Sequence, residues 1–192
     1  MDCTSAIKSL SLPAPVVGVI VGWILGMCSR YFDDRLFGAK LTIDCGTAPG
    51  NRIESPDSLY VKFCVRNTKR RVAKNCRAYI IALHEFSNGK AIGQSVMSDS
   101  FQIPWAGYDF EPRDIPPNIS QYVDLVRFSK INLGWDFQTK PGLYASLSSI
   151  TRRSGTYQFT VVVTGESTVP AKKQINVDYD MVDWKNARVY DA

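Results

Sequence analysis

The chain has 192 residues, of which 45% are hydrophobic and 21% are charged, and this composition excludes a chain that is disordered throughout. The formal net charge of +5 suits a domain near an anionic membrane surface, but by itself it does not indicate nucleic-acid binding. The single histidine excludes a metal site built from two or more histidines, and no C-x-x-C spacing replaces it.

A stretch without charged residues lies near the N-terminus, from Ser9 to Ser29. A helix over this stretch would be about 30 Å long, which matches the hydrocarbon core of a bilayer. We therefore predict one transmembrane helix over residues 13–32, preceded by an N-terminal tail over residues 1–12. A cleaved signal peptide is the alternative, but the sequence Leu25-Gly26-Met27-Cys28 offers no small-x-small cleavage site.

Gly18, Gly22 and Gly26 recur every four residues inside the predicted span, and this spacing places them on one helix face. Because this face lacks side chains, two helices can approach closely there, as is typical of self-association in membranes. The alternative is that glycine is simply frequent in membrane helices. The pattern predicts a homo-oligomer formed through the helix.

Lys and Arg residues flank the uncharged stretch unequally: Arg30, Arg35 and Lys40 follow it, whereas Lys8 precedes it. Positive residues stay on the cytoplasmic side of a membrane helix, so the bias places the domain that follows in the cytoplasm. We therefore expect a single-pass membrane protein with a cytoplasmic soluble domain.

The cysteines agree with this orientation, because the chain has five, an odd number, and a secreted domain more often carries paired cysteines. Cys64 and Cys76 fall on neighbouring predicted strands, where buried thiols are common. The alternative is a disulfide between two sheets, as in extracellular immunoglobulin domains, and it would reverse the predicted orientation.

From residue 40 onward, short segments with apolar side chains at alternate positions predict β-strands. The predicted strands are Leu41–Cys45, Leu59–Arg66, Cys76–Phe86, Phe101–Trp105, Tyr122–Phe128, Leu143–Leu147, Tyr157–Thr164 and Lys173–Tyr179. Turn residues separate them, and no convincing amphipathic helix interrupts them. We therefore predict an all-β domain over residues 40–179, an immunoglobulin-like antiparallel sandwich. Residues 180–192 are predicted to form a polar C-terminal tail.

The stretch YVKFCVRNTKRRVAKNCRAYI, residues 60–80, resembles a recurring pattern of uncharacterised bacterial membrane-anchored proteins. In these proteins a segment L-x-V-x-N-x-G-R-x-x-A-x-x-C begins a sandwich domain after one or two membrane helices. The matching residues in this chain are Val65, Asn67, Arg71, Ala73, Asn75 and Cys76. The glycine expected after Asn67 is replaced around Thr68-Lys69. The resemblance implies a membrane anchor and an immunoglobulin-like sandwich, and it implies no activity.

No catalytic constellation is visible in the sequence. His84 lies in the predicted central strand before Glu85, and without a nucleophile elbow we expect it to be structural rather than a triad member. There is no glycine-rich phosphate loop, and the carboxylates in the loops lack the spacing of a calcium site. We therefore expect a protein that is not an enzyme and that holds no cofactor or metal.

Five basic residues lie in or beside the loop between two predicted strands: Lys69, Arg70, Arg71, Lys74 and Arg77. Such a cluster suits an anionic lipid headgroup or a nucleotide. The alternative is that these are solvated turn residues that keep a strand edge from aggregating. No aromatic residue is interleaved with them, which argues against a nucleic-acid groove.

Trp105, Tyr108 and Phe110 form a second candidate, because aromatic side chains on one loop make good anchors for a partner. The alternative is that they fold back and cap one end of the sandwich.

The sequence thus favours a membrane-anchored, non-enzymatic interaction or sensor module, with the lipid bilayer and an unknown protein or small anionic ligand as its partners. The alternative is a ligand-gated membrane effector whose basic loops bind an anionic nucleotide signal.

Overall fold

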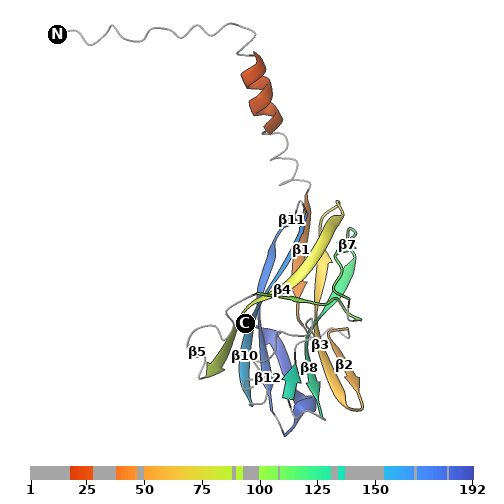
Figure 1. The fold of residues 1–192 in the computed structure, drawn as a ribbon, viewed down its shortest axis with the longest axis vertical. Helices are drawn as coiled ribbons and strands as arrows, with labels where there is room; N and C mark the ends of the chain where they lie inside the picture. Colours follow the sequence, from red (N-terminus) through yellow and green to blue (C-terminus); the bar gives the residue numbers. More distant parts are fainter. Residues whose placement is uncertain are drawn as a thin grey trace, which may run out of the picture. The chain divides into compact units, whose positions relative to one another are not determined.

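The computed structural model describes residues 18–27, 38–46, 50–87, 90–92, 100–107, 109–130, 134–136, 154–166, 168–180 and 182–192. The chain divides into two compact units, Met1–Phe37 and Gly38–Ala192. In the first unit, residues 18–27 form an α-helix that falls inside the predicted span (Figure 1). The rest of that span, residues 13–17 and 28–32, lies outside the described residues, as does the predicted tail over residues 1–12.

Within the described part of the chain, no helix combines the length and the apolar character needed to cross a membrane. The three glycines of the predicted self-association face all lie in the helix at residues 18–27. A Cβ atom added at Gly18, Gly22 or Gly26 would meet no atom within 4 Å, so this face of the helix is open.

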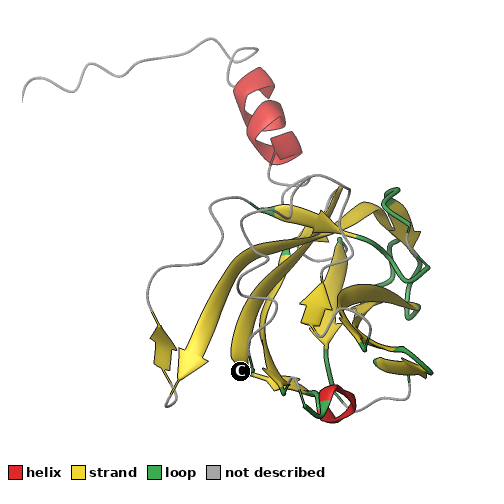
Figure 2. Ribbon diagram, turned by 60° about the horizontal axis from the view of Figure 1, so that its bottom comes forward, coloured by secondary structure: helices red, strands yellow, loops and turns green. Residues whose placement is uncertain are grey.

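The second unit consists of two β-sheets (Figures 1 and 2). The six-stranded first sheet has the order β11-β1-β3-β8-β9, and β2 also pairs with β3. Its strands are β1 (Ala39–Asp44), β2 (Arg52–Ser55), β3 (Ser58–Asn67), β8 (Ser120–Ser129), β9 (Gly134–Asp136) and β11 (Thr168–Val169).

The seven-stranded second sheet has the order β13-β12-β10-β4-β5, and β6 and β7 also pair with β4. Its strands are β4 (Ala73–Ser87), β5 (Lys90–Ile92), β6 (Phe101–Ile103), β7 (Arg113–Ile115), β10 (Gly155–Glu166), β12 (Ala171–Tyr179) and β13 (Arg188–Asp191). The prediction of an all-β domain is therefore confirmed.

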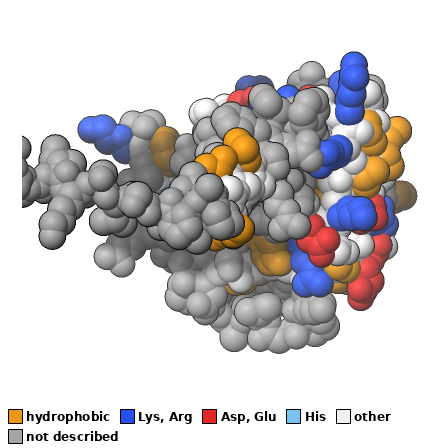
Figure 3. Space-filling model, turned by 90° about the horizontal axis from the view of Figure 1, so that it is seen from above, with side chains coloured by type: hydrophobic (Ala, Val, Ile, Leu, Met, Phe, Trp, Pro, Cys, Tyr) orange, Lys and Arg blue, Asp and Glu red, His pale blue; other side chains and the backbone are white. Residues whose placement is uncertain are grey.

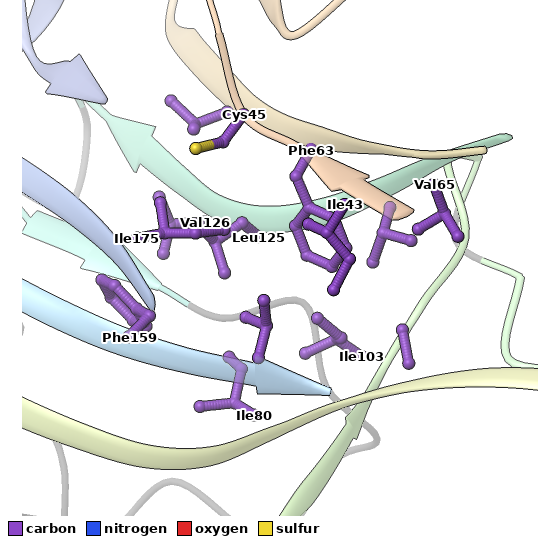
Figure 4. Close-up of a cluster of buried hydrophobic side chains, with 14 of the residues drawn as sticks. Ile43, Cys45, Phe63, Val65, Ile80, Ile103, Leu125, Val126, Phe159 and Ile175 are labelled. Atoms are coloured by element: carbon purple, nitrogen blue, oxygen red, sulfur yellow. The ribbon is translucent and has the colours of Figure 1, made fainter. Parts of the chain in front are cut away.

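The core lies between the sheets and follows from the alternation in the sequence. In β3, every second side chain from Leu59 to Val65 is buried, and in β10 every second side chain from Tyr157 to Val163 is buried. Figure 4 shows Phe63 of the first sheet and Ile80 and Phe159 of the second pointing toward one another. Because Gly38–Ala192 has this core of its own, we expect it to fold independently.

Two segments differ from the prediction. Residues 180–192, expected as a polar tail, instead form a short 3₁₀ helix, η1 (Trp184–Asn186), and β13, which pairs with β12. The reason is burial: Ala187 is 3% exposed, and Trp184 and Val189 pack against the core. The sheets were also expected to be antiparallel, but β1 and β11 pair in parallel. The predicted strand Leu143–Leu147 lies outside the described residues.

Candidate functional site

The loop between β3 and β4 lies at the end of the sandwich where β1 begins. β1 runs antiparallel to β3 with Leu41 opposite Asn67, and the N–H of Thr68 donates to the carbonyl oxygen of Lys40 at 2.8 Å. The sandwich therefore starts, at Gly38, beside the loop that carries the predicted basic cluster. We call this surface the Gly38 end: the start of β1, the β3–β4 loop, the turn between β7 and β8, and β11.

Asn67 holds the β3–β4 loop in one shape. Its side chain is fully buried, and its Nδ2 donates to the carbonyl oxygens of Arg71 at 2.6 Å and Ile115 at 3.0 Å. Its Oδ1 accepts the backbone N–H of Lys69 at 3.1 Å, and its own N–H donates to the carbonyl oxygen of Ile119. These hydrogen bonds hold the loop in place, so its basic side chains project from a fixed backbone.

The structure separates the five predicted anion-binding residues into two groups. Lys69, Arg70 and Arg71 are exposed on the loop, and Lys74 and Arg77 are exposed on β4. Lys74 lies opposite Glu166 of β10, and the neighbouring Asn75 N–H donates to Asp114 at 2.9 Å. Two carboxylates therefore lie beside the β4 group, and both accept hydrogen bonds from Asn75. Lys40, an exposed cation of β1, lies beside the loop group, and the sequence did not predict this neighbour.

Exposed apolar side chains lie beside the loop cations. Val72 (42% exposed) is on the β3–β4 loop, Ile119 (45%) precedes β8, and Val169 (67%) is in β11. The carbonyl oxygen of Ile119 accepts the N–H of Asn67. Val169 pairs with Lys40. Figure 3, seen from above the view of Figure 1, shows hydrophobic side chains next to Lys and Arg side chains, with Asp and Glu side chains among them.

The three cysteines in the described part of the chain are all free thiols. Cys76 points into the core, whereas Cys64 alternates with the buried Phe63 and Val65 and therefore points outward. The alternative of a Cys64–Cys76 disulfide is not formed, since the two side chains face different ways. Burial and the charge of Asp114 raise the pKa of Cys76 to about 11, so this thiol stays protonated at neutral pH.

The other candidate site residues that the sequence suggested are part of the sandwich structure. Trp105 is 1% exposed, so it packs inside the sandwich and does not form a recognition patch. Tyr108 lies outside the described residues, and Phe110 is half-buried. His84 is half-buried on β4, opposite Gln158. Among the residues that the structure describes, no group of three or more His, Cys, Asp and Glu side chains is placed to hold a metal ion.

No protein-family model, no curated protein and no solved structure matches the chain. The resemblance of residues 60–80 to bacterial membrane-anchored proteins therefore stays a prediction.

Proposed function

We propose that the chain is a single-pass, membrane-anchored interaction module whose sandwich contacts an anionic membrane surface through its Gly38 end. The observation that carries this proposal is that one surface holds the start of the sandwich, three exposed basic residues of the β3–β4 loop, Lys40 and three exposed apolar side chains. The uncharged segment Ser9–Ser29 is the proposed membrane anchor. The chain enters the sandwich at Gly38, so the proposed anchor is attached to the sandwich at its Gly38 end.

Two physical terms support this contact. An anionic leaflet attracts each nearby Lys or Arg with about 1 kcal/mol. The exposed apolar side chains beside these cations add the favourable free energy of burial at the boundary between headgroups and acyl chains. The cytoplasmic leaflet is the anionic one. A cytoplasmic sandwich also agrees with the excess of Lys and Arg after the span and with the free thiols of Cys45, Cys64 and Cys76.

The strand order supports an immunoglobulin-like topology for the module. In such domains, strands A, B and E are neighbours in one sheet, and strands C, F and G are neighbours in the other. Here β1, β3 and β8 are neighbours in the first sheet, and β4, β10 and β12 are neighbours in the second. This architecture displays loops at both ends of a rigid frame, which is how interaction domains of this type present their binding surfaces.

The test measures binding of the sandwich, residues 38–192, to phosphatidylcholine vesicles with and without phosphatidylserine. We expect binding that requires phosphatidylserine and weakens with salt. The double variant Arg70→Glu, Arg71→Glu should lose at least about 2 kcal/mol, roughly thirtyfold in affinity. The matched control Lys90→Glu, Lys130→Glu makes the same charge change away from the Gly38 end, and it should leave binding nearly unchanged.

Equal losses in the two double variants would mean that net charge alone drives binding, and would overturn the proposed orientation. Nucleotide binding by the sandwich without vesicles, lost in the Arg70→Glu, Arg71→Glu variant, would instead favour the ligand-gated effector.

Self-association through the glycine face is the second part of the proposal. Cross-linking of the full chain in membranes should be abolished by Gly22→Ile, because the added side chain separates the two backbones. The control Ile24→Phe adds bulk on a different face of the helix and should preserve the cross-link. Cross-linking that survives Gly22→Ile would remove the glycine face as the contact.

A further inference from the structure

The last strand of the second sheet has one edge that pairs with no other described strand. β13 pairs with β12 on one side, with Val189 opposite Val177, and it stands at the end of the strand order. The N–H of Ala192 donates to the carbonyl oxygen of Gln174 in β12. In an antiparallel ladder, the backbone groups of successive residues point alternately toward the partner strand and away from it. The N–H and C=O groups of Asp191 and Val189 therefore point away from β12.

A donor from the first sheet already uses the beginning of this edge. The guanidinium of Arg52 donates to the carbonyl oxygens of Lys185 and Ala187. Farther along the edge, no hydrogen bond joins the backbone of Val189 or Asp191 to another described residue. Two donor–acceptor pairs, two residues apart, are therefore open to the backbone of a further strand.

A pocket of about 360 Å³ lies beside the open edge. It lies where β1 ends and β2 begins, with Val61 of β3 on one side and Val189 and Tyr190 of β13 on the other. The side chain of Val189 is on the inner face of the sheet, because its partner Val177 is buried. A residue that pairs with Val189 from a new strand has its side chain on the same face. Since most of the pocket surface is apolar, an apolar side chain suits this position.

Two carboxylates lie at the other end of the open edge. Asp191, whose side chain is 57% exposed, pairs with Lys173 at 2.8 Å. Asp44, exposed at the end of β1, accepts the N–H of Gly46 at 2.9 Å and is close enough to Lys173 to attract its charge. Two acidic groups thus share one lysine, which leaves a net negative charge. A partner with a basic side chain opposite Asp191 complements this charge.

We propose that the edge of β13 binds an extended peptide segment of a partner protein, which adds an antiparallel strand to the second sheet. The peptide residue that pairs with Val189 carries an apolar side chain for the pocket. The residue two positions earlier pairs with Asp191 and carries a basic side chain. Backbone hydrogen bonds at these two positions supply affinity, and the two side chains supply specificity. The proposal is independent of the membrane contact, because this edge shares no residue with the Gly38 end.

The test uses the amidated peptide Thr-Arg-Thr-Leu-Thr with a fluorescein label at its N-terminus. Its fluorescence anisotropy, titrated with the sandwich, residues 38–192, without lipid, should show saturable binding. Methylation of the Leu amide nitrogen removes the hydrogen bond to the carbonyl oxygen of Val189 and should weaken binding at least about tenfold. The matched control methylates the nitrogen of the Thr before this Leu, which points away from β13, and should leave the affinity unchanged.

The two side-chain contacts have separate tests. Replacing the Leu of the peptide with Ala should weaken binding about tenfold, because less apolar surface is buried in the pocket, whereas replacing the middle Thr with Ala should have no effect. Asp44→Asn should weaken binding of the Arg peptide about threefold. The same variant should leave the affinity unchanged for a peptide that carries Gln in place of this Arg.

Val189→Pro tests the location of the site. Proline removes an N–H that points away from β12, so β13 still pairs with β12, and the variant should not bind the peptide. If its melting curve shows that it does not fold, the two N-methylated peptides still decide. Absence of saturable binding, equal affinities of the two N-methylated peptides, or full affinity in a folded Val189→Pro variant would overturn the proposal. The Arg70→Glu, Arg71→Glu variant should bind the peptide as the parent does, so failure of the membrane contact is distinguishable from failure of this site.

Discussion

Replacing Asn67 with Ala tests whether this side chain holds the β3–β4 loop. The variant loses three hydrogen bonds, to the carbonyl oxygens of Arg71 and Ile115 and from the N–H of Lys69. Each such bond contributes about 1 kcal/mol net. The carbonyl oxygen of Ile115 is also left without its buried donor. We therefore expect the free energy of unfolding to fall by about 3 kcal/mol, a large part of the 5–15 kcal/mol typical of a domain.

Urea unfolding of residues 38–192, followed by the fluorescence of the buried Trp105 and Trp135, measures this loss. The unfolding midpoint should fall with an unchanged m-value, and the melting temperature should fall by roughly 6–12 °C. The control Asn176→Ala removes a half-buried asparagine whose Oδ1 accepts one bond from Gln158 at 3.2 Å, and should cost about 1 kcal/mol or less. If the free energy of unfolding falls no more in Asn67→Ala than in the control, Asn67 does not hold the β3–β4 loop.

Three further predictions concern other parts of the sandwich. Gly165→Ala should lower the free energy of unfolding by about 1–3 kcal/mol, because its Cβ would meet the sulfur of Cys76 and a backbone oxygen at 2.9 Å each; an unchanged urea midpoint would contradict this. Hydrogen bonds from Cys45 and Lys173 lower the pKa of Asp191 below its ordinary value of 3.8. The contribution of Asp191 to stability is therefore complete above pH 3.8, and it is lost as the pH falls through the lower pKa of the folded state. Unfolding curves of Asp191→Asn and the parent should therefore differ at neutral pH and converge in acid, and a difference independent of pH would rule this out. Iodoacetamide should modify the half-buried Cys64 before the buried Cys45 and Cys76, and mass spectrometry that finds Cys45 modified first would show that β13 does not cover it.

Much of the fold could be predicted because it follows from the pattern of side chains along short segments of the sequence. The alternation in Leu59–Arg66 and Tyr157–Thr164 puts one apolar face on each strand, and β3 and β10 bury those faces. The sequence Asn88-Gly89 predicted a turn after the strand Cys76–Phe86. The structure adds β5, which was not predicted and which pairs with β4 with Ser87 opposite Lys90. The two turn residues themselves lie outside the described residues.

The C-terminal segment shows where local reasoning failed. Its residues looked like a polar tail because large apolar ones such as Met181, Val182, Trp184 and Tyr190 are few among them. Ala187 and Val189 are too few to predict a strand by themselves. Ala187 becomes buried and Val189 partly buried because the edge of β12 offers unpaired backbone groups and the core offers an apolar surface. Neither is visible in the sequence of the segment.

For the candidate sites too, local sequence predicts some features and the tertiary structure decides the others. The sequence by itself determined the uncharged N-terminal segment, the seven strands β1, β3, β4, β6, β8, β10 and β12, and the basic loop, because each is a property of consecutive residues. Only the tertiary structure decided that Lys74 lies beside Glu166, that Val169 lies beside Lys40, and that Arg52 of β2 donates to the carbonyl oxygen of Ala187. These partners are far apart along the chain, and strand register, which depends on the packing of the whole sandwich, brings them together.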